Sequence, residues 1–328
     1  MKKQLLAAFL CGLVIPLSLI AVGMESKTGQ IPLPSGEPEQ TQAQIQSQEE
    51  YDTQTVVAVE QDGQSAAMPL RDYLVGVVLA EMPADFQPEA LQAQAVVART
   101  YTCKRAHNAK HDDGAVCTDP GCCQGYRSTQ DYLDQGGTQA QIDRVCQAVE
   151  QTDGMVLTYQ GELIDATYFS CSGGSTEDAV EVWGQDVPYL QAVESPGEEQ
   201  APRYRERLYF TPEEFVQRTG CAGGQDPQEW FGAVTYTDGG GVDTMELCGQ
   251  IYSGVELRSL LGLRSTVFTM TAEDGQIVVD TRGFGHRVGM SQYGAQAMAQ
   301  QGSTWREILS HYYQGTEVIH MKKFENRG

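Results

Sequence analysis

Glu81 is the residue of this sequence best placed to exchange a proton with a substrate. It lies eleven residues after Leu70 and continues an apolar stripe with the spacing of one helix face: Leu70, Tyr73, Leu74, Val77 and Val78. Because Pro83 disfavours helical geometry at Met82, the helix is predicted to end there. Burial and the negative end of the helix dipole both favour a protonated carboxyl, the form that a general acid needs. The alternative is an ordinary helix-end glutamate paired with a lysine or arginine.

A second constellation is suited to a metal. His111, Cys117 and Cys123 are each six residues apart, in a loop rich in aspartate, glycine and proline. One imidazole and two thiolates are a soft ligand set of the kind that binds Zn²⁺, and three protein ligands would leave a position for water. The alternative is disulfide formation, because exported cysteines usually pair and Cys122 adjoins Cys123.

Two small-residue loops are candidates for ligand binding. Residues 170–174 read Ser-Cys-Ser-Gly-Gly after a predicted strand, and their hydroxyls and backbone amides suit sugar hydroxyl and acetamido groups; the alternative is an ordinary turn. Residues 282–295 include Gly283, Gly285 and Gly289, but the spacing between the last two is one residue too long for a dinucleotide fingerprint and the βαβ context is missing. Ser291 is a plausible N-cap for the following helix. His286 is either a ligand contact or a structural hydrogen-bonding residue.

The secondary-structure elements predicted to position these residues include both helices and strands. A strand is predicted at 55–59, the helix that ends at Met82 follows, and a second helix runs from Pro88 to about Arg105. The remaining predictions are hairpins at 155–159 with 163–169 and at 267–272 with 277–281, and final helices at 292–300 and 305–313, the last with a capping box at Thr304 and Glu307. We therefore predict an α+β fold, with helices and β-hairpins around a substrate cleft. Residues 195–250 are glycine-rich and give no assignment.

The N-terminus predicts export. Residues 1–24 contain two lysines followed by an uncharged apolar run from Leu5 to Gly23, which predicts one transmembrane helix with the rest of the chain outside the cytoplasm. A cleaved signal peptide is the alternative, because Ala21-Val22-Gly23 is a small-x-small site. Residues 25–53 are polar and predict a flexible linker, which leaves residues 54–328 as the exported domain.

The charge limits the choice of partner. Lysine and arginine number 22 against 44 aspartates and glutamates, a formal charge of -22. Such a chain is not expected to bind nucleic acid or to adsorb to an anionic membrane by charge. A neutral glycan fits better, although the charge could equally serve only solubility.

Five segments resemble one known family. These are 79–101, 170–177, 182–190, 282–295 and 308–316, which read LAEMPADFQPEALQAQAVVARTY, SCSGGSTE, VWGQDVPYL, RGFGHRVGMSQYGA and ILSHYYQGT. In this order they resemble the stage II sporulation protein D family, the peptidoglycan lytic transglycosylases of endospore formers. The resemblance implies that Glu81 is the catalytic acid/base and that His111, Cys117 and Cys123 bind zinc, as in clostridial members. Cys171 is a mild departure, because the family often has Thr or Ser there.

The resemblance also implies a substrate and partners. The substrate would be peptidoglycan glycan strands without stem peptides, and the partners would be the stage II sporulation proteins M and P in a membrane complex during engulfment. We expect substrate contacts from Arg99, Tyr168, Ser170, Ser172, Gly173, Gly174, Glu177, His286, Gln292 and Tyr293. Because some relatives of this family are amidase enhancers, a glycan-binding or amidase-activating module without catalysis is the alternative.

Overall fold

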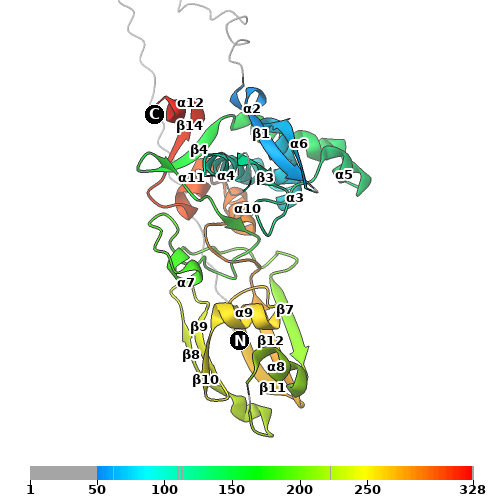
Figure 1. Ribbon diagram of the computed structural model, residues 1–328, viewed down its shortest axis with the longest axis vertical. Coiled ribbons are helices and arrows are strands. Elements are labelled where there is room, and N and C mark those ends of the chain that lie inside the picture. Colours follow the sequence, from blue (N-terminus) through cyan, green and yellow to red (C-terminus); the bar gives the residue numbers. More distant parts are fainter. Residues whose placement is uncertain (1–49, 62, 109–110, 112–113, 222, 327–328) are drawn as a thin grey trace, which may run out of the picture. The chain divides into compact units, whose positions relative to one another are not determined.

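The structure is a computed structural model that describes residues 50–61, 63–108, 111, 114–221 and 223–326, all within one compact unit. Helices and several small sheets are mixed along the chain, as predicted (Figure 1). Its apolar side chains gather in two main clusters, one built around a long central helix and one around two three-stranded sheets. The candidate residues are positioned mainly by the first cluster.

The central helix is α4 (Pro88–His107), with Pro88 in its first turn as predicted. It is buried along most of its length, and its alanines allow other helices to approach closely. Its helical neighbours are α3 (Leu70–Glu81), α6 (Gln139–Gln151), α10 (Gln292–Gln300) and α11 (Trp305–Tyr312). Ser291 caps α10 and the capping box of Thr304 and Glu307 begins α11, so the local signals read from the sequence were correct.

Short strands frame this helical core. The antiparallel hairpin β1 (Val56–Gln61) and β2 (Gln64–Pro69) adds β3 (Val116–Cys117) in parallel, and β4 (Met155–Tyr159) lies between β14 (Glu317–His320) and β5 (Glu162–Leu163). The β4–β5 turn has Gln160 and Gly161 at positive φ, the geometry of a tight two-residue hairpin. The second strand of this hairpin is shorter than predicted. Tyr168–Phe169 (β6) pairs instead with Met290–Ser291 (β13), in parallel.

The second cluster occupies the region that the sequence left unassigned, together with the predicted hairpin of β11 (Val267–Glu273) and β12 (Gln276–Arg282). One sheet has the order β11-β12-β7, with β7 at Arg205–Phe210. The other has the order β10-β9-β8, from Gln250–Ser253, Val242–Leu247 and Phe231–Tyr236. Figure 1 shows helices α8 (Pro212–Thr219) and α9 (Gly254–Leu261) beside these strands. The two helices contribute Phe215 and Leu257 to the second apolar cluster.

The remaining elements are short. They are α2 (Tyr51–Gln54), α5 (Thr129–Asp134), α7 (Ala179–Trp183), the 3-10 turn η2 (Pro227–Trp230) and α12 (Met321–Glu325). In α2, Tyr51 and Asp52 are buried. The folded domain therefore includes the last residues of the segment predicted as a linker, because burial of these two side chains fixes the chain before residue 54.

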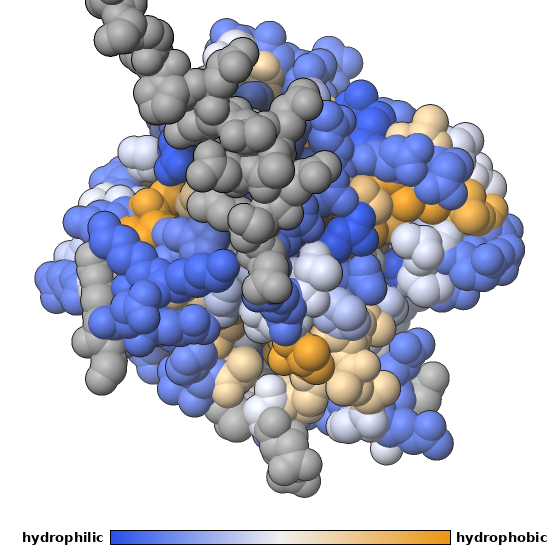
Figure 2. Space-filling view, turned by 90° about the horizontal axis from the view of Figure 1, so that it is seen from above, coloured by the Kyte–Doolittle hydropathy of each residue, from blue (hydrophilic) through white to orange (hydrophobic). Residues whose placement is uncertain are grey.

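The predicted membrane span and residues 25–49 of the linker lie outside the described residues. Among the helices that the structure does describe, none is long and apolar enough to cross a membrane. On the face shown in Figure 2, hydrophilic residues cover most of the visible surface and apolar residues form small patches.

Candidate active site

Glu81 ends α3 at the edge of a cleft of about 920 Å³. The helix stops there because Met82 is extended, with φ -131°, as expected for a residue before proline. The cleft is lined by residues of α3, the 120–123 turn, β6 and its continuation to Ser170, Trp183, the 202–203 loop, the 284–286 loop and the start of α10. The helix end that the sequence predicts therefore places the carboxyl group at the surface of a cavity.

The surroundings of Glu81 favour its protonated form. Burial, the largest effect, raises the pKa of this carboxyl. The backbone N–H of Gly125 donates to Oε1 at 2.8 Å and opposes the rise, as do the nearby side chains of Gln292 and Tyr168. A β-carbon at position 125 would lie 2.8 Å from Oε1, so glycine is needed there for the carboxyl to sit against the backbone. The result is a fixed carboxyl that holds its proton at higher pH than an exposed glutamate does.

Glu81 is the only carboxylate among the described residues that line the cleft. Tyr168 lies beside it and donates its hydroxyl hydrogen to Oε1 of Gln124 at 3.1 Å. Gln292 begins α10, and its buried Nε2 lies close enough to the Glu81 carboxyl to lower the pKa of that group, although it makes no hydrogen bond of good geometry to a described residue. An unsatisfied buried donor next to the acid is suited to a substrate oxygen, because leaving it unpaired is costly.

His286 acts as a structural hydrogen-bonding residue. Its Nδ1 accepts from the backbone N–H of Val288 at 3.2 Å, so Nε2 carries the hydrogen and donates to the carbonyl of Tyr168 at 3.0 Å. Burial lowers the pKa of this imidazole to about 4, so the ring is neutral near neutral pH. His286 lines the cleft as predicted, and these contacts favour the structural alternative: it fixes the strand that carries Tyr168.

Aromatic rings form another part of the cleft wall. Trp183 is 44% exposed and its ring centroid lies 5.3 Å from that of His286. Tyr293 packs edge-on against Phe86, and Phe284 lines the same cavity. Exposed rings beside polar groups suit sugar rings, which have apolar faces and polar edges. In the sequence Trp183 and Phe284 stand out only as parts of two motifs, and no local signal places them in the cleft.

The predicted metal ligands are brought together. His111 Nε2 lies 3.5 Å from Cys123 Sγ, and 3.3 Å from the thiol of Cys122, which was not predicted as a ligand. Together with Cys117, the four possible donor atoms lie within 4.8 Å of one another. Nδ1 of His111 lies 3.3 Å from a carboxylate oxygen of Glu60, which orients the ring. Zinc bonds of about 2.3 Å to sulfur and about 2.0–2.1 Å to nitrogen fit such a set after a small contraction.

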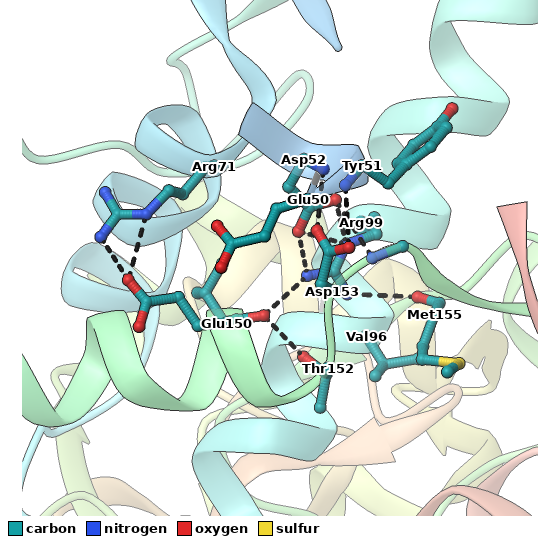
Figure 3. Close-up of polar contacts among 12 residues, drawn as sticks. Glu50, Tyr51, Asp52, Arg71, Val96, Arg99, Glu150, Thr152, Asp153 and Met155 are labelled. Atoms are coloured by element: carbon teal, nitrogen blue, oxygen red, sulfur yellow. Dashed lines mark hydrogen bonds and ion pairs between the residues drawn. The ribbon is translucent and has the colours of Figure 1, made fainter. Parts of the chain in front are cut away.

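Arg99 does not line the cleft, contrary to its predicted contact with substrate. It is fully buried in α4, and its Nε and Nη2 donate to the carboxylate of Asp52 at 2.9 and 2.5 Å (Figure 3). Nη1 and Nη2 also donate to the carbonyls of Met155 and Val149. The donors of Arg99 are therefore directed at Asp52 and at these two carbonyls.

Part of the predicted 170–177 segment also turns away from the cleft. Ser170 lines it, but Ser172 is fully buried, and its N–H and hydroxyl donate to Glu198 at 2.5 and 3.0 Å. Glu177 is buried and pairs with Arg287 at 3.0 Å. Gly173 and Gly174 have positive φ, and their N–H groups donate to Glu198 and Ser172. At these four positions the observed hydrogen bonds go to other groups of the protein, and the Glu177 carboxylate is buried with one oxygen, Oε1, left without a hydrogen-bond partner among the described residues.

The fold and the site define a mixed α and β protein whose cleft, as lined by the described residues, holds one carboxylate. The profile of the stage II sporulation protein family, SpoIID, matches residues 59–159, which include Glu81 and the metal-ligand cluster. Stage II sporulation protein D of Bacillus subtilis (strain 168) is 39% identical over 266 residues, covering 79% of this chain and 77% of that protein. The protein of the same name from Bacillus amyloliquefaciens is 39% identical over 264 residues, covering 78% and 76%.

This chain belongs to the stage II sporulation protein D family, which acts in sporulation. It is also similar to the protein named amidase enhancer of B. subtilis (strain 168). The two are 29% identical over 303 residues, covering 75% of this chain and 40% of that protein.

Proposed function

We propose that this protein is a lytic transglycosylase that cleaves peptidoglycan glycan strands without stem peptides. The observation that carries the proposal is that Glu81 is the one carboxylate among the described residues of the cleft lining, and burial raises its pKa. Glycosidases that hydrolyse their substrate normally use two carboxylates, one as acid and one as base or nucleophile. A transglycosylase that uses the sugar's own hydroxyl needs only one.

The reaction uses Glu81 twice. Protonated Glu81 gives its proton to the glycosidic oxygen while the bond from that oxygen to C1 breaks. The carboxylate then takes the proton of the C6 hydroxyl as its oxygen bonds to C1, which closes a 1,6-anhydro ring and regenerates the acid. No water is consumed. Gln292 is placed to bind a substrate oxygen beside the acid, and Trp183 offers a surface for a sugar ring.

We also propose that one Zn²⁺ is bound by His111, Cys117 and Cys123, with Cys122 as the fourth ligand. Four protein ligands are typical of structural zinc sites. The metal would then hold the 117–125 segment, whose Gly125 N–H meets Glu81. Zinc supplies rigidity in this proposal, and proton transfer stays with Glu81.

The location and partners are proposals as well. The lysines and apolar run of residues 1–24 support a single-pass membrane protein with its catalytic domain outside the cytoplasm. Family membership supports a membrane complex with the stage II sporulation proteins M and P at the sporulation septum.

A second function is favoured by one finding, the similarity to the protein named amidase enhancer. In that case the cleft would bind glycan strands and the chain would activate a separate amidase without cleaving glycan. Digestion of purified, peptide-free strands distinguishes this second function from the transglycosylase. Anhydro ends support a transglycosylase, hydrated reducing ends a hydrolase, and uncut strands a binding module.

A further inference from the structure

A groove of about 510 Å³ lies on the outer face of the sheet β11-β12-β7. The other face of this sheet holds Leu208, Phe210 and Val279 against the second apolar cluster. The groove is lined by Arg205, Arg207 and Arg282 of the sheet and by Tyr236 and Gly240, among other residues. It is therefore a basic surface in a strongly acidic protein.

Two arginines of this region have carboxylate partners. Arg207 makes two hydrogen bonds to Asp280 at 2.6 and 2.7 Å, and Arg264 lies 2.9 Å from Glu206. Three others, Arg203, Arg205 and Arg282, have no carboxylate within 4.0 Å among the described residues. Because the chain has twice as many acidic as basic residues, this lack of partners is not explained by a shortage of carboxylates. We call these three residues the arginine triplet.

The triplet places like charges side by side. Arg205 and Arg282 are direct partners across the antiparallel strands β7 and β12, and both side chains are exposed. Like charges directly opposite one another destabilise a sheet. An anion bound between them would remove this repulsion, whereas a neutral or cationic ligand would not.

The triplet has one member at the cleft of Glu81 and two in the groove. Arg203 lines that cleft, with its guanidinium 5.6 Å from the ring centre of Phe284, another lining residue. Arg205 follows two residues later in the groove, and the N–H of Gly283 donates to the carbonyl of Tyr204 at 2.8 Å, joining the two segments. A polymer that fills the cleft can therefore extend over the triplet.

We propose that the arginine triplet binds the lactyl carboxylates of the glycan strand whose reacting bond lies at Glu81, an inference that rests on the proposed function. Hydrolysis of the amide between a stem peptide and its sugar leaves a free carboxylate on the lactyl group. A planar guanidinium binds such a carboxylate through two parallel hydrogen bonds. An intact stem peptide places a neutral amide at the same position. The triplet thus recognises strands from which an amidase has already removed the peptides.

The test measures binding without cleavage, in the full-length chain carrying Glu81→Gln. Peptide-free strands are compared as free acids and as methyl esters, and Arg205→Gln with Arg282→Gln is compared with this parent. Loss of two exposed charge pairs should weaken binding of the free acid between about twofold and about 25-fold. The esters should bind the parent and the double variant equally. Arg218→Gln removes one exposed guanidinium from α8, at the opposite face of the sheet, and should change nothing; the single variants Arg205→Gln and Arg282→Gln, which remove the same charge as this control, should each weaken binding of the free acid.

Three results would overturn the inference. They are equal binding of free acid and ester by the parent, equal binding of the free acid by parent and double variant, and an equal effect of the arginine changes on strands that keep their stem peptides. The last would assign the triplet to peptide carboxylates. Because no cleavage is needed, this test can fail while anhydro products still form, and it can succeed if none do.

Discussion

Removing the carboxylate of Asp52 should strongly destabilise the domain, although this residue lies in a segment that reads as a linker. Asp52 is 2% exposed and accepts from Arg99, which is fully buried (Figure 3). Asp52→Asn leaves the guanidinium with neutral acceptors only, two backbone carbonyls and the new amide oxygen, and removes the carboxylate charge that pairs with it. Breaking a buried ion pair in this way costs about 3–5 kcal/mol, a large part of the stability of an ordinary domain.

Thermal unfolding measures this cost. A loss of about 3–5 kcal/mol corresponds to a decrease in Tm of roughly 6–20 °C in a large domain. Asp280→Asn is the matched control: it breaks an Arg–Asp pair of similar geometry with Arg207, but both side chains are close to half exposed and solvent screens them. A chain that starts at residue 54 lacks Asp52 and should show a similar decrease in Tm.

The same variant tests the role of Arg99. Below its Tm, Asp52→Asn should keep the kcat/KM of the parent, because Arg99 does not line the cleft. A Tm within 2 °C of the parent's, or a fall in kcat/KM without a fall in Tm, would refute the structural role given to this pair.

The remaining predictions concern the cleft and the cysteines. Glu81→Gln should lower glycan cleavage by about 10²- to 10⁴-fold, and a residual rate above roughly a tenth would contradict its role as the acid. In the parent, kcat/KM should fall as pH rises through the pKa of Glu81, which lies above that of an exposed glutamate. Because folding raises this pKa, ionised Glu81 costs stability, so Glu81→Gln should have the higher Tm near neutral pH and lose that advantage in acid. Gly125→Ala should push on the Glu81 carboxyl and cost about 10²-fold in activity, whereas Gly224→Ala, which has open space, should cost nothing. Elemental analysis should find one zinc per chain, lost in both Cys117→Ser and Cys122→Ser; metal retained in the latter would mean a three-ligand site.

Local signals in the sequence predicted many of the helix ends and hairpins that surround the site. Pro83 marked the end of the Glu81 helix, and Thr304 with Glu307 marked the start of α11, because both effects act within a few residues. Two predicted hairpins formed around two-residue turns with positive φ, one of them ending in Gly275. The position of Glu81 at a half-buried helix end followed from the same short-range reasoning.

Long-range pairing could not be read in the same way. Arg99 was expected at the substrate, but its partner Asp52 lies 47 residues earlier, in a segment whose composition resembles a linker. Glu177 pairs with Arg287 across 110 residues, so its burial has no signal near it in the sequence. Cys122 was treated as a reason to doubt the metal, whereas the loop brings its thiol to His111.

The products of glycan cleavage test the central claim most directly. Peptide-free strands are digested by the full-length protein in water labelled with heavy oxygen, and the new ends are analysed by mass spectrometry. Cleavage by Glu81 with the sugar's own C6 hydroxyl predicts 1,6-anhydro ends that carry no label from the water. Hydrated reducing ends that carry the label would contradict the account, and strands left uncut by an intact protein would contradict it as well.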